Sequence, residues 1–222
     1  MPAILLELKD LQAVVAACSR LDLEFVSGRD RFLHGSMQAV DVPDWVGSTE
    51  RAATGKVGPL ACDHLIRPVL AGGRRRPARP REIGLFARPD GGWLAAADIE
   101  SGCGLELWVG IEGMDFLYAY RVEALPAFAR AFNLRIADRY VGRDNSFNCQ
   151  LEDTIMAGDR RVKVRAYRDG KLEIDVNGCQ GPACEVLTKG FVDFMGGTTT
   201  NVQAKAEMEA VNELTIPVEQ PE

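Results

Sequence analysis

The side chains best placed to do chemistry are two cysteines in the segment Gly-Cys-Gln-Gly-Pro-Ala-Cys at 178–184. Two thiols beside a Gly-Pro turn form half of the ligand set of a zinc or iron–sulfur site. Such a site needs a second pair of ligands. The other four cysteines are isolated from one another along the chain, and the two histidines, His34 and His64, belong to no recognised metal-binding motif. We therefore expect no metal and no cofactor.

Nucleophilic catalysis is a second chemistry for the same segment. Cys184 follows Pro182, a residue suited to the first position of a helix, and a helix N-terminus lowers the pKa of a nearby thiol. The alternative is a small side chain buried against a sheet, as free cysteines usually are. No catalytic partner accompanies Cys184, so we assign no catalytic residue. We expect the elbow (Gly178, Cys179, Gly181, Pro182 and Cys184) to turn the chain and pack a helix.

A second cluster of residues with reactive side chains is the tripeptide Cys62-Asp63-His64, which lies in an apolar run typical of a strand. Successive side chains of a strand point to opposite faces of the sheet. The three side chains therefore cannot converge on one substrate from a regular strand, and no serine or cysteine is indicated as the third member of a triad.

The third candidate is a basic loop with the sequence AGGRRRPARPR. Its Gly and Pro content excludes a helix or a strand and predicts an exposed loop. It carries Arg74, Arg75, Arg76, Arg79 and Arg81. Arginines can bind phosphates, but the loop has no aromatic side chain to stack on bases and the chain has a net charge of −6. A solvated loop, a contact with an acidic protein surface and a nucleic-acid site remain as alternatives, with the protein contact favoured over nucleic acid.

The periodicity of apolar residues predicts strands, helices and hairpins along most of the chain. Strands are expected at 3–8, 21–25, 37–40, 58–70, 82–87, 93–98, 134–141, 146–153, 161–167, 171–176 and 198–208, and helices at 11–20, 105–133 and 182–195. Pro68 favours a strand end or an edge strand, and Pro126 is expected to kink the second helix or to begin another.

Local signals add detail at three of these elements. Asp10 is placed to cap the first helix, whose buried face is predicted to carry Leu11, Val14, Val15 and Cys18. The pair Asp169-Gly170 suits a type I′ turn with two positive φ angles.

The last helix has its own pattern. Its buried face is predicted to carry Ala183, Leu187, Phe191 and Phe194, with Gly190 allowing close approach to a sheet.

Runs of strands and of helices, without strict alternation, predict an α+β fold with an antiparallel sheet and two or three helices, followed by a small ββαβ unit. The segment Met-Ala-Gly-Asp-Arg at 156–160 suggests a boundary. We predict an N-terminal α+β domain at 1–157, a C-terminal ββαβ domain at 158–210 and a disordered acidic tail at 211–222.

These residues support two resemblances. The segment RDGKLEIDVNGCQGPACEVLTKGF, with Gly178, Gly181, Pro182, Ala183 and Cys184 on the motif and Cys179 off it, resembles an uncharacterised bacterial family, domain of unknown function twenty-nine ninety-seven, over about 161–209. Residues 1–152 more loosely resemble domain of unknown function twelve fifty-seven, a chloroplast and cyanobacterial conserved reading frame, through KDLQAVVAACSRLDLEF, CDHLIR and EIGLFARPDGGWLAAAD. The insertion around 74–81 departs from that pattern. The resemblances imply two neighbouring proteins fused in one chain, working beside an AAA-type ATPase.

Together these observations predict a non-enzymatic adaptor or accessory subunit that contacts a protein partner, with an AAA-type ATPase as a candidate. The alternatives are a thiol- or metal-dependent enzyme centred on Cys184 and a nucleic-acid-binding protein using the loop at 74–81. No segment approaches the roughly 20 apolar residues of a membrane span, and the N-terminus lacks the apolar region of a signal peptide. We expect a cytoplasmic protein with reduced thiols; the oligomeric state is left open.

Overall fold

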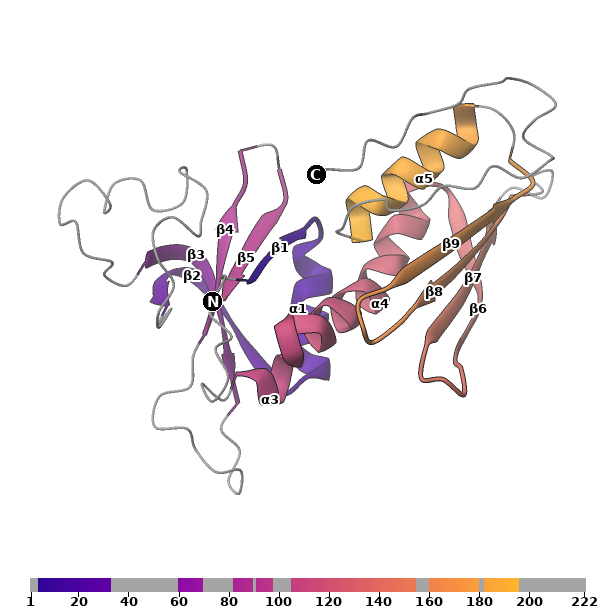
Figure 1. Ribbon diagram of the computed structural model, residues 1–222. Coiled ribbons are helices and arrows are strands. Elements are labelled where there is room, and N and C mark those ends of the chain that lie inside the picture. Colours follow the sequence, from indigo (N-terminus) through magenta and orange to yellow (C-terminus); the bar gives the residue numbers. More distant parts are fainter. Residues whose placement is uncertain are drawn as a thin grey trace, which may run out of the picture.

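Two antiparallel sheets flank a central group of helices in the computed structural model, which confirms the predicted α+β class (Figure 1). The structure describes residues 4–32, 60–69, 82–89, 91–97, 105–154, 160–179 and 182–195. The predicted strands at 37–40 and 198–208, the arginine loop, Gly181 and the tail at 211–222 lie outside these ranges. Within them, every helix is too short or too polar to cross a membrane.

The first sheet contains five strands in the order β1-β5-β4-β3-β2, each antiparallel to its neighbours. The strands are β1 (Ile4–Leu8), β2 (Leu23–Phe32), β3 (Leu60–Pro68), β4 (Ile83–Ala87) and β5 (Trp93–Ala97). The hairpin predicted from the Pro-Asp-Gly-Gly turn is present, with Ala87 opposite Trp93. Pro68 ends β3, as predicted, although β3 is an internal strand of the sheet.

Helix α1 (Leu11–Arg20) connects the two edge strands β1 and β2 of this sheet. Its N-terminus is capped as predicted, because the Asp10 carboxylate accepts hydrogen bonds from the backbone N–H groups of Gln12 and Ala13. The buried side chains are Ala13, Val14, Ala17 and Cys18. The prediction of the buried face is therefore confirmed for Val14 and Cys18 and wrong for Leu11 and Val15, which are only half-buried.

The middle of the chain forms α3 (Glu106–Val109), the 3₁₀ turn η2 (Ile111–Gly113) and the long helix α4 (Met114–Ala131). Helix α4 continues through Pro126, where the sequence predicts a kink or a new helix. A proline inside a helix removes one backbone hydrogen bond, but α4 is buried along most of its length. Packing of this kind, more than local propensity, stabilises helices in folded proteins.

The second sheet is a meander of four strands in the order β6-β7-β8-β9. The strands are β6 (Leu134–Val141), β7 (Phe147–Asp153), β8 (Arg161–Ala166) and β9 (Leu172–Asn177). The predicted boundary between 157 and 158 thus falls between β7 and β8, which are hydrogen-bonded neighbours with Leu151 opposite Val162. The hairpin that the sequence analysis placed in a separate unit shares its sheet with β6 and β7.

The turn between β8 and β9 differs from the predicted type I′ geometry. Gly170 has a φ of 86°, whereas Asp169 is not among the positive-φ residues. The Gly170 N–H donates to the Tyr167 carbonyl, and the Tyr167 N–H donates to the Lys171 carbonyl. This is the pattern of a three-residue hairpin loop in which one glycine adopts the left-handed conformation.

Helix α5 (Pro182–Met195) begins at Pro182, as predicted. Its buried residues are Cys184, Leu187, Phe191 and Met195, so the buried face was wrong at two positions: Ala183 is exposed and Phe194 is half-buried. Gly190 lies against Phe132, at the end of α4, and not against a sheet.

One continuous hydrophobic core extends from the inner face of the first sheet, through α1 and α4, to α5 and the second sheet. Helix α4 lies at its centre and contacts both α1 and α5 (Figure 1). A smaller cluster packs on the opposite face of the first sheet around Leu65, Phe86 and Leu94. The helices therefore join the two sheets through shared apolar packing.

Candidate functional site

The two cysteines of the elbow lie on either side of the junction between β9 and α5. Cys179 follows β9, after Gly178 with a φ of 69°, and Cys184 lies in the first turn of α5. Both side chains are covered, with 9% of Cys179 and 3% of Cys184 exposed.

Burial is the largest cause that raises the pKa of the Cys184 thiol, to about 12 from an ordinary value of 9.0. A nucleophilic cysteine needs the opposite shift, because the thiolate is the reactive form. The helix N-terminus would lower the pKa of Cys184, but the increase caused by burial is larger. Cys184 behaves as a packed residue whose thiol stays protonated at neutral pH.

An ion pair lies beside this elbow. The guanidinium of Arg160 binds both oxygens of the Asp153 carboxylate, its Nε lying 2.8 Å from Oδ1 and 3.0 Å from Oδ2. These hydrogen bonds hold the pKa of Asp153 below its usual value. Arg160 also interacts electrostatically with Cys179, so the pair places a cation near one of the two thiols.

The tripeptide at 62–64 does not form a catalytic cluster. Asp63 accepts a hydrogen bond from the Ala87 backbone N–H at 2.8 Å. His64 instead lies between the rings of Phe25 and Trp93, at centroid distances of 5.2 and 4.8 Å, and its Nδ1 accepts a hydrogen bond from the Gly28 N–H. The imidazole is held by two tilted ring contacts and by a backbone donor, which is a structural arrangement.

A surface that the sequence analysis did not single out lies on α3 and η2, residues 106–113. Two large apolar side chains are exposed there: Leu107 is 67% exposed and Ile111 is 81% exposed. The side chains of Trp108 and Val109, between them in the sequence, are buried in the core. We call residues 106–113 the α3–η2 segment.

The backbone of the α3–η2 segment departs from helical geometry at three residues. Gly110, Glu112 and Gly113 have φ angles of 77°, 55° and 73°. A positive φ is costly for a residue with a side chain, such as Glu112. A carboxylate oxygen of Asp115 would lie 2.8 Å from a methyl group placed on Gly110, so this glycine also allows close approach.

Acidic side chains accompany the two exposed apolar residues. Glu106 and Glu112 belong to the segment, and Asp115 follows it. Asp115 pairs with Arg168 of the β8–β9 turn at 3.4 Å. The sequence predicts a continuous helix here; the paired glycines at 110 and 113 were the available signal that the chain turns out of it.

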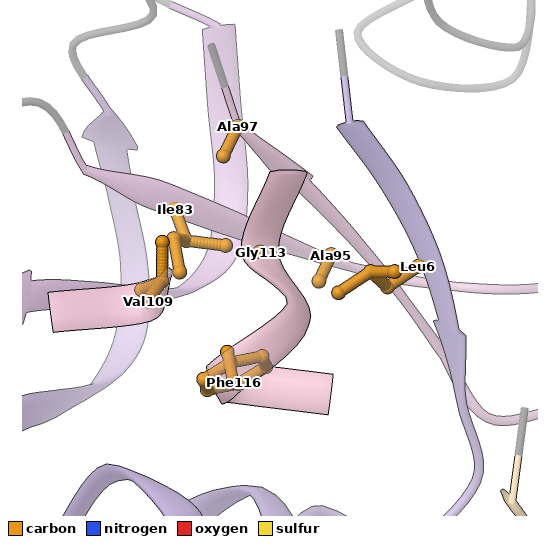
Figure 2. A pocket seen from close by; sticks show the side chains of 7 residues that line it. All are labelled: Leu6, Ile83, Ala95, Ala97, Val109, Gly113 and Phe116. Carbon is orange, nitrogen blue, oxygen red and sulfur yellow. The ribbon is translucent and has the colours of Figure 1, made fainter. Parts of the chain in front are cut away.

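A small cavity lies on the inner side of the same segment (Figure 2). It is lined only by apolar groups and has a volume of about 10 Å³. The lining residues come from the first sheet and from α3, η2 and α4: Leu6, Ile83, Ala95, Ala97, Val109, Gly113 and Phe116. Such a space holds at most one water molecule, and an apolar cavity of this size stays dry. We interpret it as a packing gap, not a ligand pocket.

Within the described ranges, no group of three or more His, Cys, Asp or Glu side chains is arranged to hold a metal ion. The arginines at 74, 75, 76, 79 and 81 are not among the described residues, so their role stays a prediction. Comparisons with protein-family models, curated proteins and solved structures found no match to the chain.

Proposed function

We propose that this protein is a non-enzymatic accessory subunit that binds a protein partner through the α3–η2 segment. The observation that carries the proposal is the exposure of Leu107 and Ile111 on a backbone that is anchored in the core by Trp108 and Val109. Single exposed apolar residues are ordinary, but here two belong to one eight-residue segment with three positive φ angles.

Burial of these side chains by a partner is a source of binding free energy. Covering one large aliphatic side chain completely contributes roughly 1.5–3 kcal/mol. The segment is already ordered in the free protein, since its inner side chains pack in the core. Binding to a preformed surface loses less conformational entropy than binding to a flexible one.

The charges indicate the chemistry of the partner. Glu106 and Glu112 lie beside the apolar pair and favour lysine or arginine at the rim of the partner's surface. A partner with apolar side chains surrounded by basic ones fits this segment. The AAA-type ATPase implied by the family resemblances is the first candidate to test.

The test compares the protein with a double variant, Leu107→Ser with Ile111→Ser. Partners retained by the immobilised full chain are identified by mass spectrometry, and one is purified and titrated calorimetrically with each form. We expect the double change to weaken binding by at least about tenfold, corresponding to about 1.4 kcal/mol.

Val186→Ser is the matched control, because Val186 is 63% exposed but lies on α5. The control is expected to bind like the unmodified protein. Equal affinity of the double variant and the unmodified protein for every purified partner would contradict the proposal.

A further inference from the structure

The edge strand β6 of the second sheet presents a surface that is separate from the α3–η2 segment. Among the described strands β6 has one neighbour, β7 (Figure 1). All residues from 137 to 141 are exposed, although successive side chains of a strand point to opposite faces of the sheet. Tyr140 is 57% exposed and Val141 is 63% exposed. This end of β6 is therefore uncovered on both of its faces.

The β6–β7 hairpin fixes which backbone groups of β6 point outward. The Gly142 N–H donates to the Ser146 carbonyl across the hairpin at 2.7 Å. Pairing alternates along an antiparallel ladder, so the N–H and C=O groups of Tyr140 point toward β7 and those of Arg139 and Val141 point away from it. The edge thus presents two donors and two acceptors, which are a template for a further strand.

One of these outward donors is held by a carboxylate of the same strand. The Arg139 N–H donates to Oδ1 of Asp138 at 2.8 Å. Among the residues that the structure describes, the Val141 N–H and the carbonyls of Arg139 and Val141 have no hydrogen-bond partner. A bulge between Ile136 and Asp138 limits the regular edge to residues 138–141. A docked strand would supply a carbonyl to the Arg139 N–H and release Asp138 to pair with a cation.

We propose that residues 138–141 are a docking site for an extended segment of another protein, which adds to the second sheet as an antiparallel strand. Backbone hydrogen bonds then supply affinity, and side-chain pairs select the segment. Directly opposed side chains share a face and favour opposite charges. From its N-terminus, the segment therefore carries an apolar residue opposite Val141, an apolar or aromatic one opposite Tyr140, an acid opposite Arg139 and a base opposite Asp138.

A second copy of this chain fits the edge less well, because the charges of β6 are not self-complementary. Two antiparallel strands related by a two-fold axis place one residue opposite its own copy. With Asp138 or Arg139 at the axis, like charges face each other, which destabilises the pair. With Tyr140 or Val141 at the axis, both charged residues face an uncharged residue or a like charge. A different protein with the complementary charges is therefore the occupant.

The test titrates the full chain with a fluorescent synthetic peptide, Ser-Thr-Val-Tyr-Glu-Lys-Thr-Ser, and follows binding by anisotropy. A control peptide has the Glu and the Lys exchanged. We expect the first peptide to bind about tenfold more tightly, because the exchange turns two attractive cross-strand pairs into repulsive ones. No binding of either peptide up to about 1 mM, or equal affinity for both, would overturn the proposal.

A charge-reversed double variant, Asp138→Lys with Arg139→Glu, tests recognition without a change in the core, since both side chains are exposed. It is expected to prefer the control peptide. Retention of the original preference would contradict the assigned register. The double variant Leu107→Ser with Ile111→Ser is expected to bind both peptides as the unmodified protein does, which separates this edge from the α3–η2 segment. Loss of peptide binding in that variant would contradict the proposed site.

The contribution of the backbone is tested at Val141. Val141→Pro removes an outward N–H, a change that edge strands tolerate, and is expected to weaken peptide binding at least about fivefold. Val141→Thr keeps the N–H and is expected to bind within about twofold of the unmodified protein. Equal binding by the proline and threonine variants would exclude strand addition. A dimer in sedimentation that Val141→Pro dissociates would overturn the choice of occupant in favour of a second copy.

Discussion

The phenolic oxygen of Tyr120 donates a hydrogen bond to the carbonyl of Phe194 at 2.9 Å, which ties the middle of α4 to the last turn of α5. The same oxygen accepts hydrogen bonds from the backbone N–H groups of Lys9, at 2.8 Å, and Asp10, at 3.3 Å. The next residue, Arg121, donates to the carbonyls of Met195 and Gly170. Two consecutive side chains of α4 thus connect the start of α1, the end of α5 and the β8–β9 turn.

Tyr120→Phe removes the hydroxyl that satisfies three partly buried backbone groups. We expect a loss of about 1–3 kcal/mol in the free energy of unfolding, because the two N–H groups and the carbonyl lose their partner. Urea unfolding measures the change. Tyr140→Phe is the control: Tyr140 is exposed on β6, and its change is expected to stay within about 0.5 kcal/mol. Equal stability of the two variants would show that the network contributes little.

Gly190→Ala tests the contact between α5 and the end of α4. In an open helix this change stabilises by roughly 0.5–1 kcal/mol. Here the added methyl would lie 2.1 Å from Cζ of Phe132, so we expect a destabilisation of about 1–3 kcal/mol.

The matched experiment for Gly190 is a double-mutant cycle. Phe132→Leu shortens the opposing side chain, and the alanine should then cost less than it does beside phenylalanine. A Gly190→Ala variant more stable than the unmodified protein would contradict the packing described for this pair.

Cys184→Ser is expected to lower stability by about 1–3 kcal/mol, because a poorly satisfied hydroxyl would replace a buried thiol. Denaturant unfolding of the reduced protein measures this. A parallel assay alkylates the native protein at neutral pH, where Cys184 should react slowly. Rapid modification of Cys184 would show an exposed thiolate and support the enzyme alternative.

Alkaline pH should destabilise the protein through its buried thiols. Burial raises the pKa of Cys18 to about 12 and that of Cys149 to about 11, from 9.0. Above about pH 9 the unfolded chain loses these protons while the folded chain keeps them, so stability falls as the pH rises towards the folded-state pKa values. Each thiol contributes a slope of up to about 1.4 kcal/mol per pH unit.

The predicted fall in stability is tested by measuring the free energy of unfolding from about pH 8 to about pH 10.5. Cys18→Ala removes one of the titrating groups and should reduce the slope. A slope that is unchanged in the variant would show that Cys18 does not hold its proton in the folded state.

Replacement of Arg74, Arg75 and Arg76 by glutamate tests the predicted role of the arginine loop. If the loop contacts an acidic protein surface, association should slow and its salt dependence should weaken. Binding kinetics at several salt concentrations measure both. Nucleic-acid affinity is expected to stay near background. Binding tighter than ~10⁻⁶ M at about 150 mM salt, abolished by the triple change, would support the nucleic-acid alternative.

The sequence alone determined the features that depend on neighbours along the chain. Asp10 caps α1, Pro182 begins α5, and the Pro-Asp-Gly-Gly turn joins β4 to β5, as predicted. Caps, turns and hairpins need only a few consecutive residues of the right type, so their physical cause is already present in the sequence. The α+β class follows from the order of these elements.

The tertiary structure decided what depends on contacts between distant segments. It placed β7 beside β8 in one sheet, set Gly190 against Phe132 and left Leu107 and Ile111 exposed. An apolar residue lies in the core or on the surface according to what packs over it, and that partner comes from elsewhere in the chain. Periodicity shows that a face is apolar; only the assembled core determines whether it is covered, because burial is a property of the packed whole.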